Sequence, residues 1–283
     1  MVLESLLNPV AAERRPYLMV FLGFLYSTVA IFLANWIFAE YASLVMVFLT
    51  VLACAPLMYR TIKLEEKKDV IYDSEKKIMW EHAKALDFML FLFLGITLSY
   101  TLWYIALPLD LSTATFSIQS ETIARVNSNV TGNIISGLEI FSRIFLNNLK
   151  VMIFCLLFSL TFGLGAIFIL VWNASVIGVA LGDFIRDKLS IYAGSMGFTK
   201  LAAYFHVTSW GLLRYGIHGV PEILAYFVAG LAGGIISIAI IKHDFGTKRL
   251  EKILLDTSDL ILIAVGLLFL GAVIETYITP FLF

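Results

Sequence analysis

Six polar residues of this chain lie close to the ends of apolar runs and carry side chains that bind ions or exchange hydrogen bonds. They are Asn147, Asn148, Arg214, His218, Glu222 and Glu275. His218 and Glu222 are four residues apart, the spacing that places two side chains on one face of a continuous helix. Pro221, however, suits the first turn of a helix, and an acidic residue beside it suits the positive end of the helix dipole. We therefore expect a helix to begin here, with His218 in the preceding turn, which weighs against a metal site built on this pair.

The residues before this turn form an unusual polar stripe. His206, Trp210, Arg214 and His218 follow one another at four-residue intervals, so they project from one side of a helix. An arginine at this depth either extends to the lipid headgroups or pairs with a carboxylate, and Glu222 and Glu275 are the candidates. Both alternatives remain open at this stage.

Patterns that belong to hydrolytic enzymes are absent from the sequence. It contains no H-E-x-x-H, no G-x-S-x-G, no P-loop and no pair of aspartates inside the apolar runs. We expect no catalytic residues, no bound metal and no cofactor, and we do not expect the protein to be an enzyme.

The composition is that of a membrane protein. Of the 283 residues, 60% are hydrophobic and 14% are charged, a balance that a water-soluble domain cannot bury in one core. A hydrocarbon core of about 30 Å requires about 20 apolar helical residues. Seven runs meet this requirement approximately, at 17–39, 42–59, 87–108, 149–172, 200–217, 222–241 and 259–281. We predict an all-α, polytopic bundle of about seven transmembrane helices.

The basic residues predict the orientation of this bundle. With the N-terminus inside, only Arg125, Arg143, Lys150 and Arg214 face outward, which leaves sixteen of the 20 lysines and arginines on the inner side. The positive-inside rule therefore favours an inner N-terminus and an outer C-terminus. In this orientation the six polar residues named above map to one outer level, where we predict a polar cluster.

Two further segments carry structural signals. Residues 134–145 have the apolar spacing of an amphipathic helix, which would either lie flat on the outer interface or cap the bundle. The apolar run from Leu149 to Gly182 would be about 51 Å long as one helix, which overshoots the bilayer. We expect a break at Asn173, followed by a short interfacial or re-entrant helix at 174–184, with Gly178 and Gly182 on a close-packing face.

The run after Glu222 contains two ridges of small residues. Ala225, Ala229 and Gly233 form one, and Gly230 with Gly234 forms the other. Such ridges let helix backbones approach closely in lipid. The partner is the fourth span, the seventh span or a second copy of the chain, and packing within the chain is favoured.

We divide the chain into three parts: an N-terminal transmembrane hairpin at 1–60, a cytosolic helical segment at 61–86 and a five-span membrane domain at 87–283. The middle segment interleaves charges of both signs. A basic surface facing anionic lipid is one interpretation, but six acidic residues offset the bases, so a solvated face is expected.

The third part resembles the stage II sporulation protein M family. The resemblance rests on Phe145-Leu146-Asn147-Asn148, Gly163 and Gly165, Asn173 with Gly178, His218-Gly219, Glu222 and the small residues from Ala225 to Gly234. Members often have Asn-Gly where this chain has Asn173-Ala174, and Pro-His-Gly where it has Ile217-His218-Gly219. In spore formers the family is associated with a membrane complex that includes wall-degrading partners.

The resemblance implies a non-catalytic scaffold that assembles envelope machinery in the cell membrane, with membrane proteins or a second copy as partners and no nucleic acid. The alternative is a transporter or lipid-handling protein in which the outer polar cluster contacts a headgroup or an ion.

Overall fold

The computed structural model describes residues 9–72, 74–130, 137–162, 165–190, 197–242 and 247–282. All regular structure in these ranges is helical, as predicted. The long helices are α3 (Leu18–Ile37), α4 (Ala42–Ile71), α5 (Glu75–Ala106), α8 (Gly137–Phe162), α9 (Gly165–Ser190), α10 (Gly197–Lys242) and α11 (Lys248–Val273). The short ones are α2 (Pro9–Arg14), η1 (Ala39–Tyr41), α6 (Leu109–Thr115), α7 (Ser117–Val130), the π-helical η2 (Ile274–Ile278) and α12 (Thr279–Leu282).

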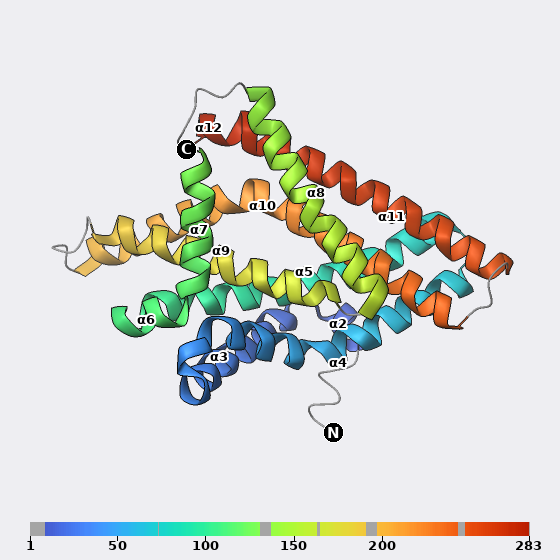
Figure 1. Ribbon diagram of the computed structural model, residues 1–283, viewed down its shortest axis with the longest axis horizontal. Helices are drawn as coiled ribbons and strands as arrows, with labels where there is room; N and C mark the ends of the chain where they lie inside the picture. Colours follow the sequence, from blue (N-terminus) through green and yellow to red (C-terminus); the bar gives the residue numbers. More distant parts are fainter. Residues whose placement is uncertain are drawn as a thin grey trace.

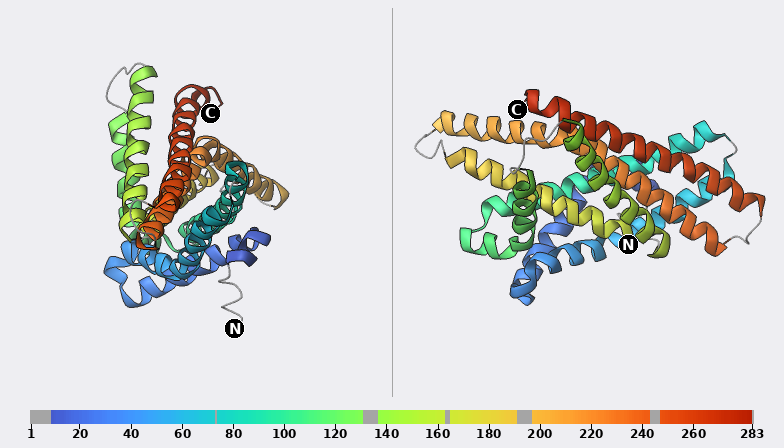
Figure 2. Two further views of the ribbon diagram at one scale, coloured as in Figure 1. Left: turned by 90° about the vertical axis from the view of Figure 1, so that its right-hand side faces the viewer. Right: turned by 45° about the horizontal axis from the view of Figure 1, so that its top comes forward.

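Among the described residues, seven helices are long and apolar enough to cross a membrane, which confirms the prediction of an all-α bundle with about seven such helices. Helix α10 lies at its centre and packs against α8, α9, α11 and α4 (Figure 1). Helices α3, α4 and α5 form a second group on the opposite side from α8 and α11 (Figure 2). In the apolar stretch of α10 83% of residues are buried, against 17% in α8 and 22% in α11. Helices α8 and α11 are therefore the least covered of the seven candidate spans.

The break expected at Asn173 does not exist. Helix α9 runs through it from Gly165 to Ser190, so residues 174–184 are the second half of a long helix and not a separate interfacial or re-entrant one. The side-chain amide of Asn173 donates to the Ile169 carbonyl at 2.8 Å, within its own helix, rather than capping a helix end. The preceding helix instead ends at Phe162, so the apolar run divides about ten residues earlier than predicted.

The turn expected at His218 is also absent, because α10 continues for 46 residues with Pro221 inside it. Residues 200–217 and 222–241 thus belong to one helix, and only its second half, Gly219–Lys242, meets the requirements for a span. Proline removes one backbone hydrogen bond and is tolerated inside membrane helices. His218 and Glu222 consequently occupy one continuous helix, one turn apart.

The amphipathic helix predicted at 134–145 is likewise part of a longer one. From Gly137 onward these residues form the first turns of α8, which continues to Phe162. Residues 134–136 of the predicted helix lie outside the described residues. Between α5 and α8 the chain forms α6 and α7, which pack against α4.

These corrections redistribute the basic residues between the two ends of the bundle. Arg186 donates to the carbonyls of Ile105 and Leu107 at the C-terminal end of α5. Lys242 pairs with Glu66 at the other end. Arg186, Lys188 and Lys200 are thus assigned to the predicted outer side. The number of lysines and arginines on the inner side falls from sixteen to thirteen, and the number on the outer side rises from four to seven. The bias keeps its direction, and an inner N-terminus stays a prediction.

Candidate polar site between α8, α10 and η2

A buried amide and a carboxylate form the centre of the site. Asn148 on α8 is 8% exposed, and its side-chain amide donates to Glu222 Oε1 at 2.5 Å. Glu222 follows Pro221 on α10, at the level where α8 and α10 pack together. A polar group removed from water needs such a partner, because an unpaired one in an apolar setting costs about 1–3 kcal/mol.

A second carboxylate approaches from the third helix. Glu275 lies in η2, the π-helical continuation of α11, which packs against both α8 and α10. Widened helical turns of this kind are frequent at functional sites. Three aromatic rings hold α8 against α11 beside the site: Phe269 lies 5.3 Å from Phe141 and 6.2 Å from Phe145, centroid to centroid.

Two further residues line the site that the sequence analysis did not single out. Tyr226 lies one turn after Glu222 on α10 and is 3% exposed. Cys155 lies two turns after Asn148 on α8 and is fully buried near the same tyrosine. The helical spacing of 222–226 and 148–155 would have indicated both, once α8 and α10 were known to be adjacent.

The structure brings Asn148, Glu222 and Glu275 together out of the six residues of the predicted outer cluster. Asn147 is exposed on another face of α8. Arg214 and His218 lie two turns and one turn before Glu222 on α10, and their side chains are outside the described part of the structure.

The chemistry of this site is that of an acidic pair with an amide donor. Two carboxylates on neighbouring helices attract a proton or a cation, and the amide of Asn148 holds one of them in place. No group of three or more His, Cys, Asp or Glu side chains in the described ranges is arranged to hold a metal ion.

The predicted packing residues define two seams. On α9, a Cβ at Gly178 would lie 2.7 Å from Tyr100 Cβ, and one at Gly182 would lie 2.7 Å from the ring of Tyr104. On α10, a Cβ at Gly230 would lie 2.7 Å from Ala166 Cβ, and one at Gly233 would lie 2.6 Å from the Leu156 carbonyl. Both seams lie within the chain, where α9 meets α5 and where α10 meets α8 and α9.

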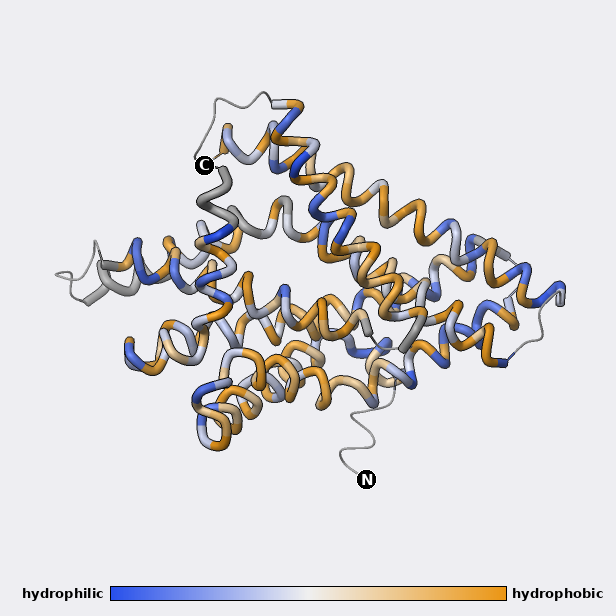
Figure 3. Tube along the Cα trace, viewed as in Figure 1, coloured by the Kyte–Doolittle hydropathy of each residue, from blue (hydrophilic) through white to orange (hydrophobic). Residues whose placement is uncertain are grey.

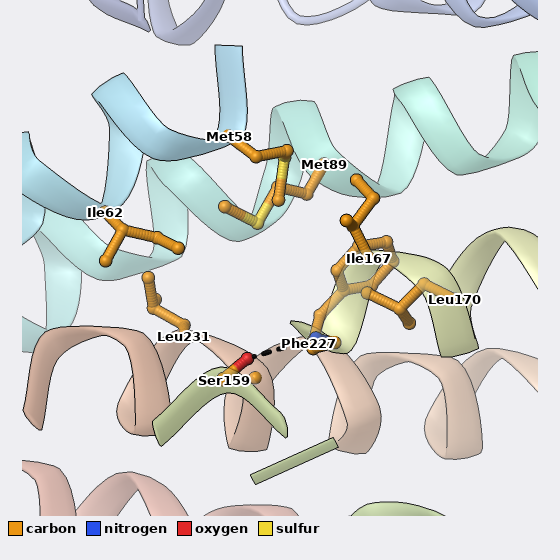
Figure 4. A pocket seen from close by; sticks show the side chains of 10 residues that line it. Met58, Ile62, Met89, Ser159, Ile167, Leu170, Phe227 and Leu231 are labelled. Atoms are coloured by element: carbon orange, nitrogen blue, oxygen red, sulfur yellow. Dashed lines mark hydrogen bonds between the residues drawn. The ribbon is translucent and has the colours of Figure 1, made fainter. Parts of the chain in front are cut away.

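The remaining ridge residues, Ala225, Ala229 and Gly234, are buried in the same helix. Beside the α10 seam, Ser159 accepts a hydrogen bond from the Ala166 amide at 3.3 Å, which satisfies one free N–H in the first turn of α9 (Figure 4). The adjoining cavity is lined by Met58, Met89 and Phe227 and has a volume of about 20 Å³, so it holds no more than a water-sized molecule.

A buried ionic network lies away from this site, between α2, α4 and α5. His82 Nδ1 is 2.8 Å from Glu65 Oε2, and His82 Nε2 is 2.9 Å from Asp69 Oδ1. All three side chains are at most 1% exposed. Only the contact with Glu65 is a hydrogen bond, but two carboxylates beside one buried ring favour the charged imidazolium over the neutral form. The charged stretch at 61–86, expected to present a solvated face, is thus partly a core.

Lys68 extends this network to the N-terminal helix. Its ammonium lies 2.8 Å from Glu65, 3.0 Å from Glu13 and 3.4 Å from Glu81. Burial raises the pKa of Glu13, and the hydrogen bond from Lys68 acts in the opposite direction. The network therefore fastens α2 to the α4–α5 hairpin.

Helices of this length and composition, with polar groups paired between them, define an all-helical integral membrane protein. Residues 88–280 match the family model of stage II sporulation protein M, and the chain belongs to that family. It is also 28% identical over 167 residues to an uncharacterized protein of Methanocaldococcus jannaschii, a region that covers 58% of this chain and 84% of the relative. No solved structure matches the chain.

Proposed function

We propose that the protein is a non-catalytic scaffold of the cell membrane that assembles envelope proteins or copies of itself. The observation that carries this proposal is the uneven coverage of the bundle: the span in α10 is mostly enclosed, whereas α8 and α11 are the least covered of the candidate spans. Membership of the stage II sporulation protein M family supports a membrane protein of this general kind.

The internal pairing of polar groups supports the same proposal. Asn148 is bonded to Glu222, and His82 is enclosed by Glu65 and Asp69. These contacts hold the helices in place and leave the outward faces of α8 and α11 for other molecules. On α8 that face contains Phe154 and Phe158, which are 54% and 43% exposed.

The test compares two double variants of equal chemistry. Phe154→Ala with Phe158→Ala removes two exposed rings from α8, whereas Phe21→Ala with Phe48→Ala removes two exposed rings from α3 and α4. After gentle extraction, a stoichiometric partner or dimer should be lost from the α8 variant and retained by the control. Equal retention in both variants would contradict docking on α8.

One observation favours a second function, the transport or binding of an ion or lipid headgroup. Glu222 and Glu275 are like charges within range of one another, next to buried Tyr226. A pair of carboxylates inside apolar helices is a default candidate for an ion path. Liposome flux that is present in the wild type and lost in Glu222→Gln would favour this function, and absence of flux in both would count against it.

A further inference from the structure

At the end of the bundle where α4 meets α5, acidic and basic side chains differ in burial. This end comprises residues 60–84 and is called the hairpin end. The acidic residues with described side chains point inward: Glu65 and Asp69 are fully buried, Glu66 is 2% exposed, and the side chain of Glu81 is 16% exposed. Each has a cationic partner, which for Glu65 and Asp69 is His82, for Glu66 is Lys242, and for Glu81 is Lys84.

Five of the seven lysines and arginines of the same end are exposed; the other two are Lys68, in the buried network, and Lys84, which pairs with Glu81. Exposed side chains there are Arg60, Lys63, Lys67, Lys76 and Lys77. The side chains of Asp73 and Glu75 lie outside the described part. Even if both of these acids were exposed, the surface of the hairpin end would carry five basic side chains and two acidic ones. The near balance of charges along the sequence is therefore not the balance on the surface.

The position of these bases relates them to the bilayer. Helix α4 has 30 residues and is thus about 45 Å long, more than a hydrocarbon core of about 30 Å accommodates. Its apolar part ends near Tyr59, so the charged last turns project beyond the core. Arg60, Lys63 and Lys67 follow at intervals of one turn from this point, within reach of the headgroup layer. Figure 3 shows the hydrophilic residues of α4, α5 and α11 gathered at this end.

Aromatic and aliphatic residues accompany the bases. Trp80 on α5 is 68% exposed, Tyr59 is 50% exposed and Ile71 is 69% exposed. Together with Lys76 and Lys77, Trp80 lines a shallow groove on the outside of α5. Bases interleaved with amphipathic aromatic rings are typical of surfaces that lie against headgroups.

We propose that the hairpin end binds anionic phospholipids of the adjacent leaflet, with Arg60, Lys63, Lys67, Lys76 and Lys77 contacting phosphate groups and Trp80 entering the headgroup layer. The buried network is what makes this surface: because the described acidic residues are paired internally, the exposed side chains of the hairpin end are mainly basic, and one of them, Lys77, lies 4.1 Å over the ring of Tyr72. This binding is independent of the scaffold proposal.

The experiment uses the full chain in detergent, titrated with phosphatidylglycerol or with phosphatidylcholine, and counts bound lipid by native mass spectrometry. The variant Lys63→Gln, Lys67→Gln, Lys76→Gln, Lys77→Gln removes four bases from the hairpin end. The control, Arg125→Gln, Arg143→Gln, Lys150→Gln, Lys188→Gln, removes four exposed bases elsewhere. Thermal melting in phosphatidylcholine tests whether both variants fold. If the quadruple hairpin variant does not fold, the double variant Lys76→Gln, Lys77→Gln replaces it.

We expect the wild type and the control to prefer phosphatidylglycerol, and the hairpin variant to bind it about tenfold more weakly. Raised salt should reproduce the loss, because it screens exposed charges. Equal binding of the two lipids by the wild type would overturn the proposal, and so would a control that loses as much binding as the hairpin variant.

Discussion

At the scale of single residues, the bond between Asn148 and Glu222 connects α8 to α10. Glu222→Ala should lower the free energy of unfolding by about 1–3 kcal/mol, because the buried amide of Asn148 loses its acceptor. Glu222→Gln keeps an oxygen at the same position and should cost less. Thermal unfolding in detergent compares the two variants, and equal losses would show that the hydrogen bond does not stabilise the bundle.

His82 allows a second prediction at this scale. His82→Ala leaves Glu65 and Asp69 buried without the cation between them, and removing one partner of such a pair costs about 3–5 kcal/mol. The measured Tm should fall strongly. Lys76→Ala, an exposed cation of the same helix, is the matched control and should change the Tm little. A similar Tm for the two variants would contradict the network.

Sequence reasoning reached these two residues to different degrees. Glu222 could be singled out because a carboxylate beside an apolar run is costly wherever the run is embedded. His82 could not, because its segment mixes charges as a solvated helix does. Only the packing of α4 on α5 and α2 determines which of those charges are buried.

At the scale of elements, the small residues of α10 let neighbouring helices approach. Gly233→Leu must displace α8, since even a Cβ would lie 2.6 Å from the Leu156 carbonyl and 3.0 Å from Ser159 Cβ. We expect a loss of about 1–3 kcal/mol, as for overpacked cores. Gly266→Leu on α11 is the control, because nothing lies within 4 Å of its Cβ position. Unchanged unfolding of the Gly233 variant would place that glycine against lipid.

The helices themselves were predictable, and their breaks were not. Apolar runs of about 20 residues predict spans because the bilayer sets their length. Asn173 and Pro221 are signals that soluble helices use at their ends, yet in α9 and α10 they lie in helix interiors. In apolar surroundings an unpaired backbone group costs so much that a helix continues through residues that would end it in water.

At the scale of the whole molecule, composition alone was sufficient to predict the class of protein, because 60% hydrophobic residues admit few alternatives. The same composition says little about which faces meet protein and which meet lipid. That distinction is carried by the uneven burial of α10 compared with α8 and α11, which appears only when the helices are assembled.

The scaffold proposal is tested most directly by native mass spectrometry of the protein released gently from its own membrane, with subunit number, co-purifying proteins and bound lipids recorded together. We predict a stoichiometric protein partner or a discrete homodimer, which dissociates in the Phe154→Ala, Phe158→Ala variant. A monomer without any protein partner, and with an ion or lipid that is lost in Glu222→Gln, would contradict the scaffold and favour transport or lipid handling.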